Sequence, residues 1–342
     1  MFDVGRSKRA QQAFAFDDIT IVPSRRTRGE EEVSLQWRID AYSFDFPLLA
    51  APMDSVVSPA TAIRIGQLGG LGVLNLEGIW TRYDDPQPLL EEIIAAKDPI
   101  EATRRMQTIY AEPIKSELIG KRVAQIREAG VPTAGSLSPQ NTRAYAQAVV
   151  DSGVDFFVIR GTTVSAEHVS SDLEPLNLKK FIYELDVPVI VGGCATYQAA
   201  LHLMRTGAAG VLVGFGGGTA YTSRSVLGVA VPMASAVSDV AAARRDYLDE
   251  SGGRYVHVIA DGSVVRSGDI AKAIACGADA VMVGSPLARA EEAPGRGYHW
   301  GPEAWHERLP RGESARLCSD WWGKDVELGT LNVEVLLGPP AL

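Results

Sequence analysis

The sequence predicts a (β/α)8 barrel, because short apolar runs alternate with amphipathic segments along most of the chain. The chain has 342 residues, and a barrel of this class needs about 250, so one barrel with additions fits better than two complete domains. Residues 257–285 give a third observation. Two apolar runs flank one helical segment there, with Gly and Ser just past the strand ends, as expected for one β-α-β unit.

Eight apolar runs are the expected strands, and most lack polar alternation, as strands covered on both faces do. They are residues 47–51, 71–75, 133–138, 156–160, 188–192, 210–214, 257–260 and 280–284. The helices expected between them are residues 59–68, 89–96, 114–129, 138–153, 176–185, 197–206, 234–250 and 267–276. Several of these helices stop at Gly, the residue favoured just past a helix C-terminus.

Three regions are additions to the barrel, and residues 1–342 are expected to form one domain. Residues 1–45 form an N-terminal extension, and residues 76–130 an elaborated connection between the second and third strands. Residues 291–330, rich in Gly, Pro, Trp and charge, resemble a flap over an active site. No convincing last helix follows, so that helix is expected to be missing, or reduced to residues 331–337.

Composition excludes several classes of function. The net charge is −9, and the one short basic stretch, at Arg25, Arg26 and Arg28, is followed at once by three glutamates, so no nucleic-acid partner is expected. No apolar run reaches the roughly 20 residues of a membrane span. The three cysteines lack metal or disulfide spacing. We therefore expect a cytoplasmic protein with reduced thiols.

The ends of the last two strands indicate the chemistry. Asp261-Gly262 follows the seventh strand, and Gly284-Ser285 follows the eighth. Bare backbone N–H groups at such positions can surround a dianion, and loops after strands 7 and 8 often form a phosphate site in these barrels. The sequence thus predicts a barrel that grips a phosphorylated small molecule.

Four ordered motifs resemble those of the IMP dehydrogenase/GMP reductase family. They are residues 16–23 (FDDITIVP), residues 51–56 (APMDSV) with 69–73 (GGLGV), residues 213–224 (VGFGGGTAYTSR), and the strand ends at 261–262 and 284–285. Many members carry a pair of CBS domains between the second and third strands, and the connection here is too short for that pair. The chain is most similar to the bacterial IMP dehydrogenase-related branch that lacks CBS domains.

The resemblance places a purine nucleoside monophosphate across the C-terminal mouth of the barrel. It assigns the ribose hydroxyls to Asp261 and the base to Met53. The other substrate contacts it implies, around the phosphate, are Gly218, Thr219, Gly262, Ser263, Gly284 and Ser285. From the residues alone, Asp261 could instead cap a turn or a helix, and Met53 could be an ordinary core residue.

The chain departs from the family in its catalytic loop, where Tyr221 and Ser223 occupy the catalytic positions. Family members attack purine C2 with a cysteine thiolate, and Tyr221 stands at that position. A phenol is roughly thirtyfold less ionised than a thiol near neutrality, and its oxygen is the poorer nucleophile toward such a carbon. A covalent adduct through Tyr221 is therefore not expected, and packing in the loop or on a ligand is the alternative role.

A second departure lies at the end of the fourth strand, in the segment Arg160, Gly161 and Thr162 that corresponds to the family's cofactor site. The family has an Asp where this chain has Arg160, which cannot accept a hydrogen bond. Arg160 could pair with a phosphate, as on NADPH, or with Asp172 or Glu174. The flap's water-activating Arg-Tyr pair is not recognisable, although Tyr298, His299, Trp300 and Arg311 are available.

The resemblance implies an oxidoreductase linked to NAD or NADP that acts on IMP or GMP at purine C2, as a homotetramer or homo-octamer. It also implies a K⁺ ion on the backbone carbonyls of Gly216, Gly218 and Tyr221. Because the nucleophile is replaced, a non-catalytic nucleotide-binding regulator or assembly partner is one alternative. An FMN-dependent barrel oxidoreductase, which holds phosphate on the same loops, is another.

Overall fold

Eight parallel strands form a closed barrel in the computed structural model, which describes residues 2–6, 8–26, 29–167, 176–215, 217–218, 220–306 and 315–316. In hydrogen-bonded order they are β10 (Gly210–Val213), β11 (His257–Asp261), β12 (Ala280–Val283), β5 (Leu48–Ala50), β6 (Leu71–Asn75), β7 (Ala134–Leu137), β8 (Phe156–Arg160) and β9 (Val189–Cys194). This confirms the predicted (β/α)8 barrel.

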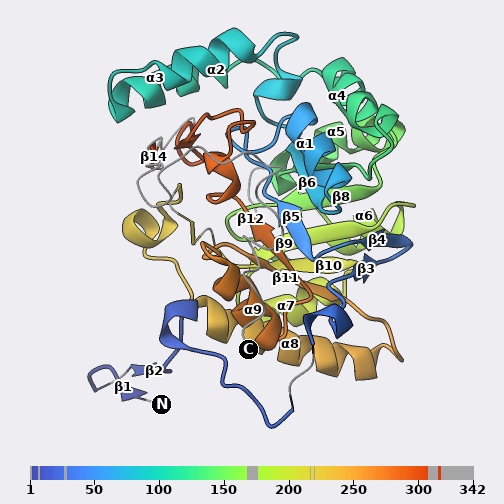
Figure 1. The fold of residues 1–342 in the computed structure, drawn as a ribbon, viewed down its shortest axis with the longest axis vertical. Coiled ribbons are helices and arrows are strands. Elements are labelled where there is room, and N and C mark those ends of the chain that lie inside the picture. Colours follow the sequence, from blue (N-terminus) through green and yellow to red (C-terminus); the bar gives the residue numbers. More distant parts are fainter. Residues whose placement is uncertain are drawn as a thin grey trace.

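Helices connect the strands on the outside of the barrel (Figure 1). They are α1 (Pro59–Gln67), α2 (Gln87–Ile94), α3 (Pro99–Ile109), α4 (Ser116–Glu128), α5 (Pro139–Asp151), α6 (Leu178–Tyr183), α7 (Tyr197–Met204), α8 (Met233–Glu250) and α9 (Ser267–Ala275). Three of them begin with the same device. Ser58, Asp98 and Ser138 each accept a hydrogen bond from the backbone N–H three residues on, and Pro follows at the first helical position.

The N-terminal extension closes one end of the barrel. Its hairpin of β3 (Trp37–Ile39) and β4 (Tyr42–Phe44) places Trp37 against the start of β11, where the indole N–H donates to His257 Nδ1 at 3.3 Å. A second hairpin, β1 (Phe2–Asp3) with β2 (Arg9–Ala10), lies farther out (Figure 1). Because the β3–β4 hairpin packs on the first residues of β8 and β11, it covers the N-terminal ends of these strands. Sites of such barrels lie at the opposite mouth.

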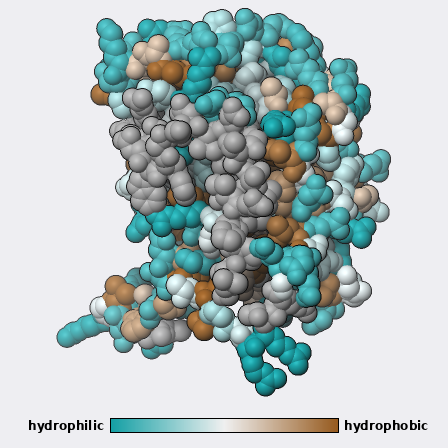
Figure 2. All heavy atoms as spheres, viewed as in Figure 1, coloured by the Kyte–Doolittle hydropathy of each residue, from teal (hydrophilic) through white to brown (hydrophobic). Residues whose placement is uncertain are grey.

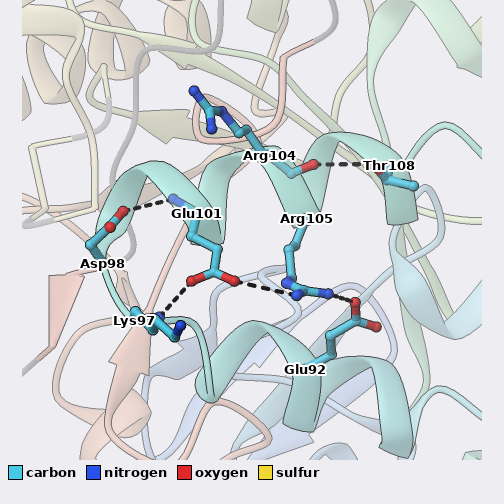
Figure 3. Close-up of polar contacts among 7 residues, drawn as sticks. All are labelled: Glu92, Lys97, Asp98, Glu101, Arg104, Arg105 and Thr108. Atoms are coloured by element: carbon cyan, nitrogen blue, oxygen red, sulfur yellow. Dashed lines mark hydrogen bonds and ion pairs between the residues drawn. The ribbon is translucent and has the colours of Figure 1, made fainter.

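The elaborated connection contains one helix that the sequence reading missed. Helix α3 packs against α2, and Arg105 of α3 forms ion pairs with Glu92 of α2 and with Glu101 (Figure 3). The two helices lie together at one end of the molecule (Figure 1). The missed helix is rich in polar and charged residues, but its buried Ala102, Met106 and Ile109 keep helical spacing, and its Asp98 cap followed by Pro is a helix start signal.

The segment after β12 returns over the mouth of the barrel. Strand β13 (Tyr298–His299) pairs with β14 (Ala315–Arg316), and Trp300 is fully buried. The expected remnant helix at residues 331–337, and most of the expected flap, lie outside the described residues. The face drawn in Figure 2 is mostly hydrophilic. Within the described ranges, no helix is long and apolar enough to cross a membrane.

Candidate functional site

Three loops meet at the C-terminal mouth because β10, β11 and β12 are neighbours in the barrel. A Cβ atom on Gly262 would lie 3.0 Å from the backbone N of Gly217, and Ser263 Oγ donates to the carbonyl of Gly217 at 3.4 Å. The Cβ position of Gly218 lies 3.6 Å from Ser285 Oγ. The structure thus brings together five residues from the loops that the sequence assigned to a phosphate.

The backbone after β11 turns through the left-handed region. Gly262 has φ +107° and Ser263 has φ +58°. Ser263 therefore adopts a conformation that favours glycine, and this agrees with the glycine that the resembled family has at this position. A left-handed conformation costs a residue with a Cβ roughly 1–2 kcal/mol, so the surrounding contacts must hold Ser263 in place. Two further assigned residues, Gly216 and Thr219, lie outside the described residues.

The next wall of the site is formed by Met53, Gly284 and His299. A Cβ atom on Gly284 would lie 3.4 Å from Met53 Sδ and 3.5 Å from the His299 ring. Met53 is buried, at 2% exposure. His299 is also buried, which lowers its pKa to about 4, and its Nδ1 is 3.0 Å from Ser55 Oγ. A neutral imidazole therefore borders the site at physiological pH.

An ion pair crosses the site from β8 to β11. Arg160 Nε donates to Asp261 Oδ2 at 2.9 Å, and both side chains are nearly buried, at 11% and 8% exposure. Burial acts to lower the pKa of Arg160, but Asp261 and Tyr221 outweigh burial and raise it above its ordinary value. Within the described part of the chain, the side-chain hydrogen bond of Asp261 comes from Arg160 and not from a helix or turn N–H.

Tyr221 completes this group. Its hydroxyl accepts a hydrogen bond from Arg160 Nη2 at 2.6 Å and lies 3.8 Å from Met53 Sδ. Burial raises the pKa of Tyr221, Arg160 opposes that rise, and Asp261 and Glu303 add to it. The net direction is upward, so the phenol is protonated at neutral pH. Tyr221 therefore contacts Met53, which the resemblance assigns to the base. It also contacts Arg160, which pairs with Asp261, the residue assigned to the ribose.

These side chains nearly fill the pocket between the loops. Its volume is about 30 Å³, and Met53, Arg160, Tyr221, Asp261 and Ser285 are among its lining residues. That is the room of about one water molecule, whereas sites for small organic ligands usually measure roughly 300–1,000 Å³. A ligand larger than a water molecule therefore requires lining side chains to move.

Glu303 fixes the end of the catalytic loop, and the sequence reading missed it. Its carboxylate accepts hydrogen bonds from Thr222 N at 2.7 Å, Thr222 Oγ1 at 2.8 Å and Ser223 Oγ at 2.6 Å. Glu303 is 2% exposed. The segment after β12 thereby holds Ser223 and the residue next to Tyr221. Its burial cannot be read from the sequence, in which Glu303 is one of several charged residues in an irregular, Trp-rich segment.

A second buried group docks this segment on the connection between the second and third strands. Asp54 accepts hydrogen bonds from Tyr110 Oη at 2.7 Å and Ile79 N at 2.9 Å, and Tyr110 accepts from the Trp300 indole at 3.1 Å. Burial raises the pKa of Asp54 to about 6, against the lowering effect of its hydrogen bonds. Tyr110 also stacks on Trp305. These contacts position the neighbouring residues His299 and Glu303.

No described cysteine lines the pocket between these loops. Cys194 ends β9 and is buried, which raises its pKa to about 12, and Cys276 follows α9. The thiol on which the family's covalent chemistry depends has no stand-in at these positions.

The tip of β8 offers a nicotinamide nucleotide the donors of Arg160 and the Thr162 hydroxyl, which can both donate and accept. Neither supplies a carboxylate for a ribose. The backbone N–H and C=O of Gly161 both bond to β9, at Gly192 and Gly193. The carbonyl of Gly218, one of the three assigned to K⁺, accepts from Tyr221 N at 3.1 Å. A second lone pair on that carbonyl remains for a cation, and the K⁺ site stays a prediction.

The fold and this mouth define a (β/α)8 barrel with glycines and serines at the ends of its last strands. The chain belongs to the IMP dehydrogenase/GMP reductase family, because the family's model, described as "IMP dehydrogenase / GMP reductase domain", matches residues 13–307. The resemblance that the motifs indicated is thereby confirmed.

Known proteins support this assignment. A protein of Mycolicibacterium smegmatis named as an uncharacterized oxidoreductase is 54% identical over 91% of this chain and 84% of its own length. The inosine-5'-monophosphate dehydrogenase of Methanocaldococcus jannaschii is 27% identical over 84% of this chain and 74% of its own. The crystal structure of an IMP dehydrogenase/GMP reductase-like protein from Corynebacterium glutamicum is 51% identical, with a TM-score of 0.88, and covers 92% of this chain and 84% of that one. A family of oxidoreductases suggests a redox cofactor.

Proposed function

We propose that this chain binds a purine nucleoside monophosphate, with the phosphate held on the loops after β10, β11 and β12. The observation that carries the proposal is the approach of Gly217 and Gly218 to Gly262, Ser263 and Ser285. Glycine-bearing loops leave backbone N–H groups bare, and such concave groups of N–H donors favour anions. We infer a purine nucleoside monophosphate as the ligand because the chain belongs to the IMP dehydrogenase/GMP reductase family.

The nucleoside end of the ligand is held differently from the family pattern. Asp261 uses Oδ2 for Arg160, and its second oxygen can still accept from a ribose hydroxyl. The purine would lie beside Met53 and Tyr221. Because the pocket measures about 30 Å³, lining side chains must shift to admit it.

The proposed chemistry is nicotinamide-linked oxidation or reduction of the bound nucleotide without a bond to the protein. NAD or NADP would meet the donors Arg160 and Thr162 at the tip of β8. A K⁺ ion on the loop after β10 and assembly into a homotetramer or homo-octamer are parts of the same proposal.

Calorimetric titration tests binding directly. We expect IMP and GMP to bind, ribose 5-phosphate to bind more weakly, and inosine to give little heat because it lacks the phosphate. The variant S285D places a negative charge in the cradle and should abolish binding. The matched variant S238D, on the exposed face of α8, should bind as the wild type does. No heat with any purine monophosphate from folded protein would refute the proposal.

A second candidate is a nucleotide-binding regulator without turnover, favoured by the phenol of Tyr221 standing where the family has a thiol. It predicts tight binding of IMP or GMP with no change in nicotinamide absorbance under any condition. An FMN enzyme would be distinguished at once by the visible absorbance of the purified protein.

A further inference from the structure

The hydroxyl of Tyr221 has a strong partner on one side only. Its oxygen accepts from Arg160 Nη2 at 2.6 Å, and its proton faces Met53 Sδ at 3.8 Å. A thioether sulfur is a weak acceptor. Among the described residues no better acceptor meets this proton, so the hydroxyl presents an O–H donor to the pocket. A buried O–H donor without a strong acceptor indicates that a ligand supplies one.

Arg160 is held in turn by a third group. Its Nε donates to Asp261 at 2.9 Å, and its guanidinium carbon lies 5.5 Å from the centre of the Tyr221 ring. The groups follow in the order carboxylate (Asp261), guanidinium (Arg160) and phenol (Tyr221), and all are nearly buried. In such a series of hydrogen bonds the carboxylate orients the guanidinium, and the guanidinium acts on the phenol. A fixed cation beside a phenol stabilises the phenolate that remains when the proton leaves.

We propose that Tyr221 is the proton donor of this site, and that it donates to an oxo oxygen or imine nitrogen of the bound nucleotide. Arg160 is a positioning residue that stabilises the phenolate, and Asp261 fixes Arg160. This inference rests on the nucleotide binding proposed above, and it replaces the missing thiol by acid–base chemistry.

The step balances without a covalent link to the protein. A reduced nicotinamide, for which Arg160 and Thr162 are the proposed contacts, would supply the hydride for the new C–H bond at the carbon of the C=O or C=N group and would itself be oxidised. The π electron pair of that double bond would move to the oxygen or nitrogen, which takes the proton from Tyr221. The product would be the hydroxyl or amine compound, and water would return a proton to the phenolate.

The charges around Tyr221 fit a proton donor. Arg160, Asp261 and Glu303 act on it, and burial keeps the phenol protonated through neutral pH. His299 lines the same pocket, but its pKa of about 4 leaves it neutral, so it is no competing cationic donor. A tyrosine with only a packing role would need no such arrangement, because phenylalanine would serve equally well.

The variant Y221F separates the two roles, since it removes only the hydroxyl. We expect the turnover number with the nucleotide and nicotinamide pair that reacts to fall about 10²–10⁴-fold, the usual contribution of a general acid. The Kd of the nucleotide should rise by no more than about tenfold, the most that one hydrogen bond commonly contributes. The control Y197F removes a comparable phenol, which donates to Asp246 on the outer surface, and should match the wild type.

A spectroscopic readout tests the hydrogen bond without turnover. With tyrosine isotope-labelled at the hydroxyl-bearing carbon, the resonance missing from Y221F belongs to Tyr221. It should shift on addition of IMP and not on addition of ribose 5-phosphate, which has no base. In R160Q the pKa of Tyr221 should rise, because the cation that lowers it is gone.

The outcomes are distinct. Absence of nucleotide binding by the wild type refutes the proposed function. Binding of IMP or GMP that leaves the Tyr221 resonance unmoved refutes the proton donor, and so does wild-type turnover by Y221F. Binding without any nicotinamide-linked reaction of IMP or GMP also refutes it, and leaves Tyr221 as a packing residue.

Discussion

Removing one partner of the Arg160–Asp261 pair should destabilise the fold far more than removing both. The variant R160M keeps the length and the apolar stem of the side chain but leaves Asp261, at 8% exposure, without its cation. At 2.9 Å and an effective dielectric constant of about 20, the gross attraction is about 6 kcal/mol. Much of this is offset by the cost of dehydrating two ions, and breaking one side of a buried pair typically costs about 3–5 kcal/mol.

The double variant R160M/D261N removes both charges and should recover most of that loss. Replacing a whole buried pair by neutral groups of similar shape is often neutral or stabilising. We therefore expect a coupling energy of at least about 2 kcal/mol between the two positions, since residues in direct contact couple by roughly 0.5–3 kcal/mol.

Urea denaturation of wild type, R160M, D261N and the double variant measures this cycle. An exposed pair, Arg205 with Glu250 on the outer surface, gives the matched control, and R205M should have a much smaller effect because solvent screens it. If R160M unfolds at the same urea concentration as the wild type, the pair does not stabilise the barrel mouth, and the reasoning about the site fails.

Three further changes have defined outcomes. His299 has a pKa of about 4 in the folded protein and about 6.5 in the unfolded chain, so its contribution to stability is complete above pH 6.5 and is lost as the pH falls to 4. Asp54 has the opposite effect. Its pKa is raised to about 6 in the folded protein, so its contribution to stability is complete below about pH 4 and is lost as the pH rises to 6. Stability between pH 4 and 6 should therefore rise with pH in D54N and fall with pH in H299Q, each by roughly 3 kcal/mol, and parallel denaturation curves would contradict this. Y221C should react with iodoacetamide near neutral pH, because Arg160 lowers the pKa of the new thiol. Peptide mass mapping identifies the labelled cysteine. Labelling of Cys194, whose pKa is about 12, before Cys at position 221 would contradict this prediction. S263G should raise the free energy of unfolding by up to about 1 kcal/mol, because it relieves the left-handed φ of +58°, and a loss of stability would show that the serine hydroxyl matters more.

The barrel could be predicted because its signals are local. Strands buried on both faces are apolar throughout, and helices that stop at glycine recur at β/α joints, so all eight strands were placed within two residues at each end. Helix α3 was not predicted, although its buried Ala102, Met106 and Ile109 recur at helical spacing, because the segment is rich in polar and charged residues. The loops at the ends of β10, β11 and β12 could be placed at one mouth because parallel strands all end there.

The pairings within the site could not be predicted, because they join residues far apart in the chain. The sequence suggests a cofactor phosphate, Asp172 or Glu174 as partners of Arg160, and the two acidic residues lie outside the described residues. The structure pairs Arg160 with Asp261, which the sequence did not suggest. The sequence reading treated the site side chains one at a time. It therefore missed that the arginine side chain is long enough to cross the mouth and reach the carboxylate assigned to the ribose.

The two departures from the family are therefore one change. Arg160 needs a buried anion, and Tyr221 needs a donor for its oxygen, and each is met by the same cluster. Reverting one position alone should fail for a physical reason. R160D puts a second carboxylate beside Asp261, and like charges at close range are costly, while Y221C alone leaves Arg160 Nη2 without its acceptor. The double variant R160D/Y221C restores the family's residues at both positions. Its loss of stability should be smaller than the sum of the losses of R160D and Y221C, because both single variants break the same hydrogen bond, and losses that simply add would show that the positions act independently.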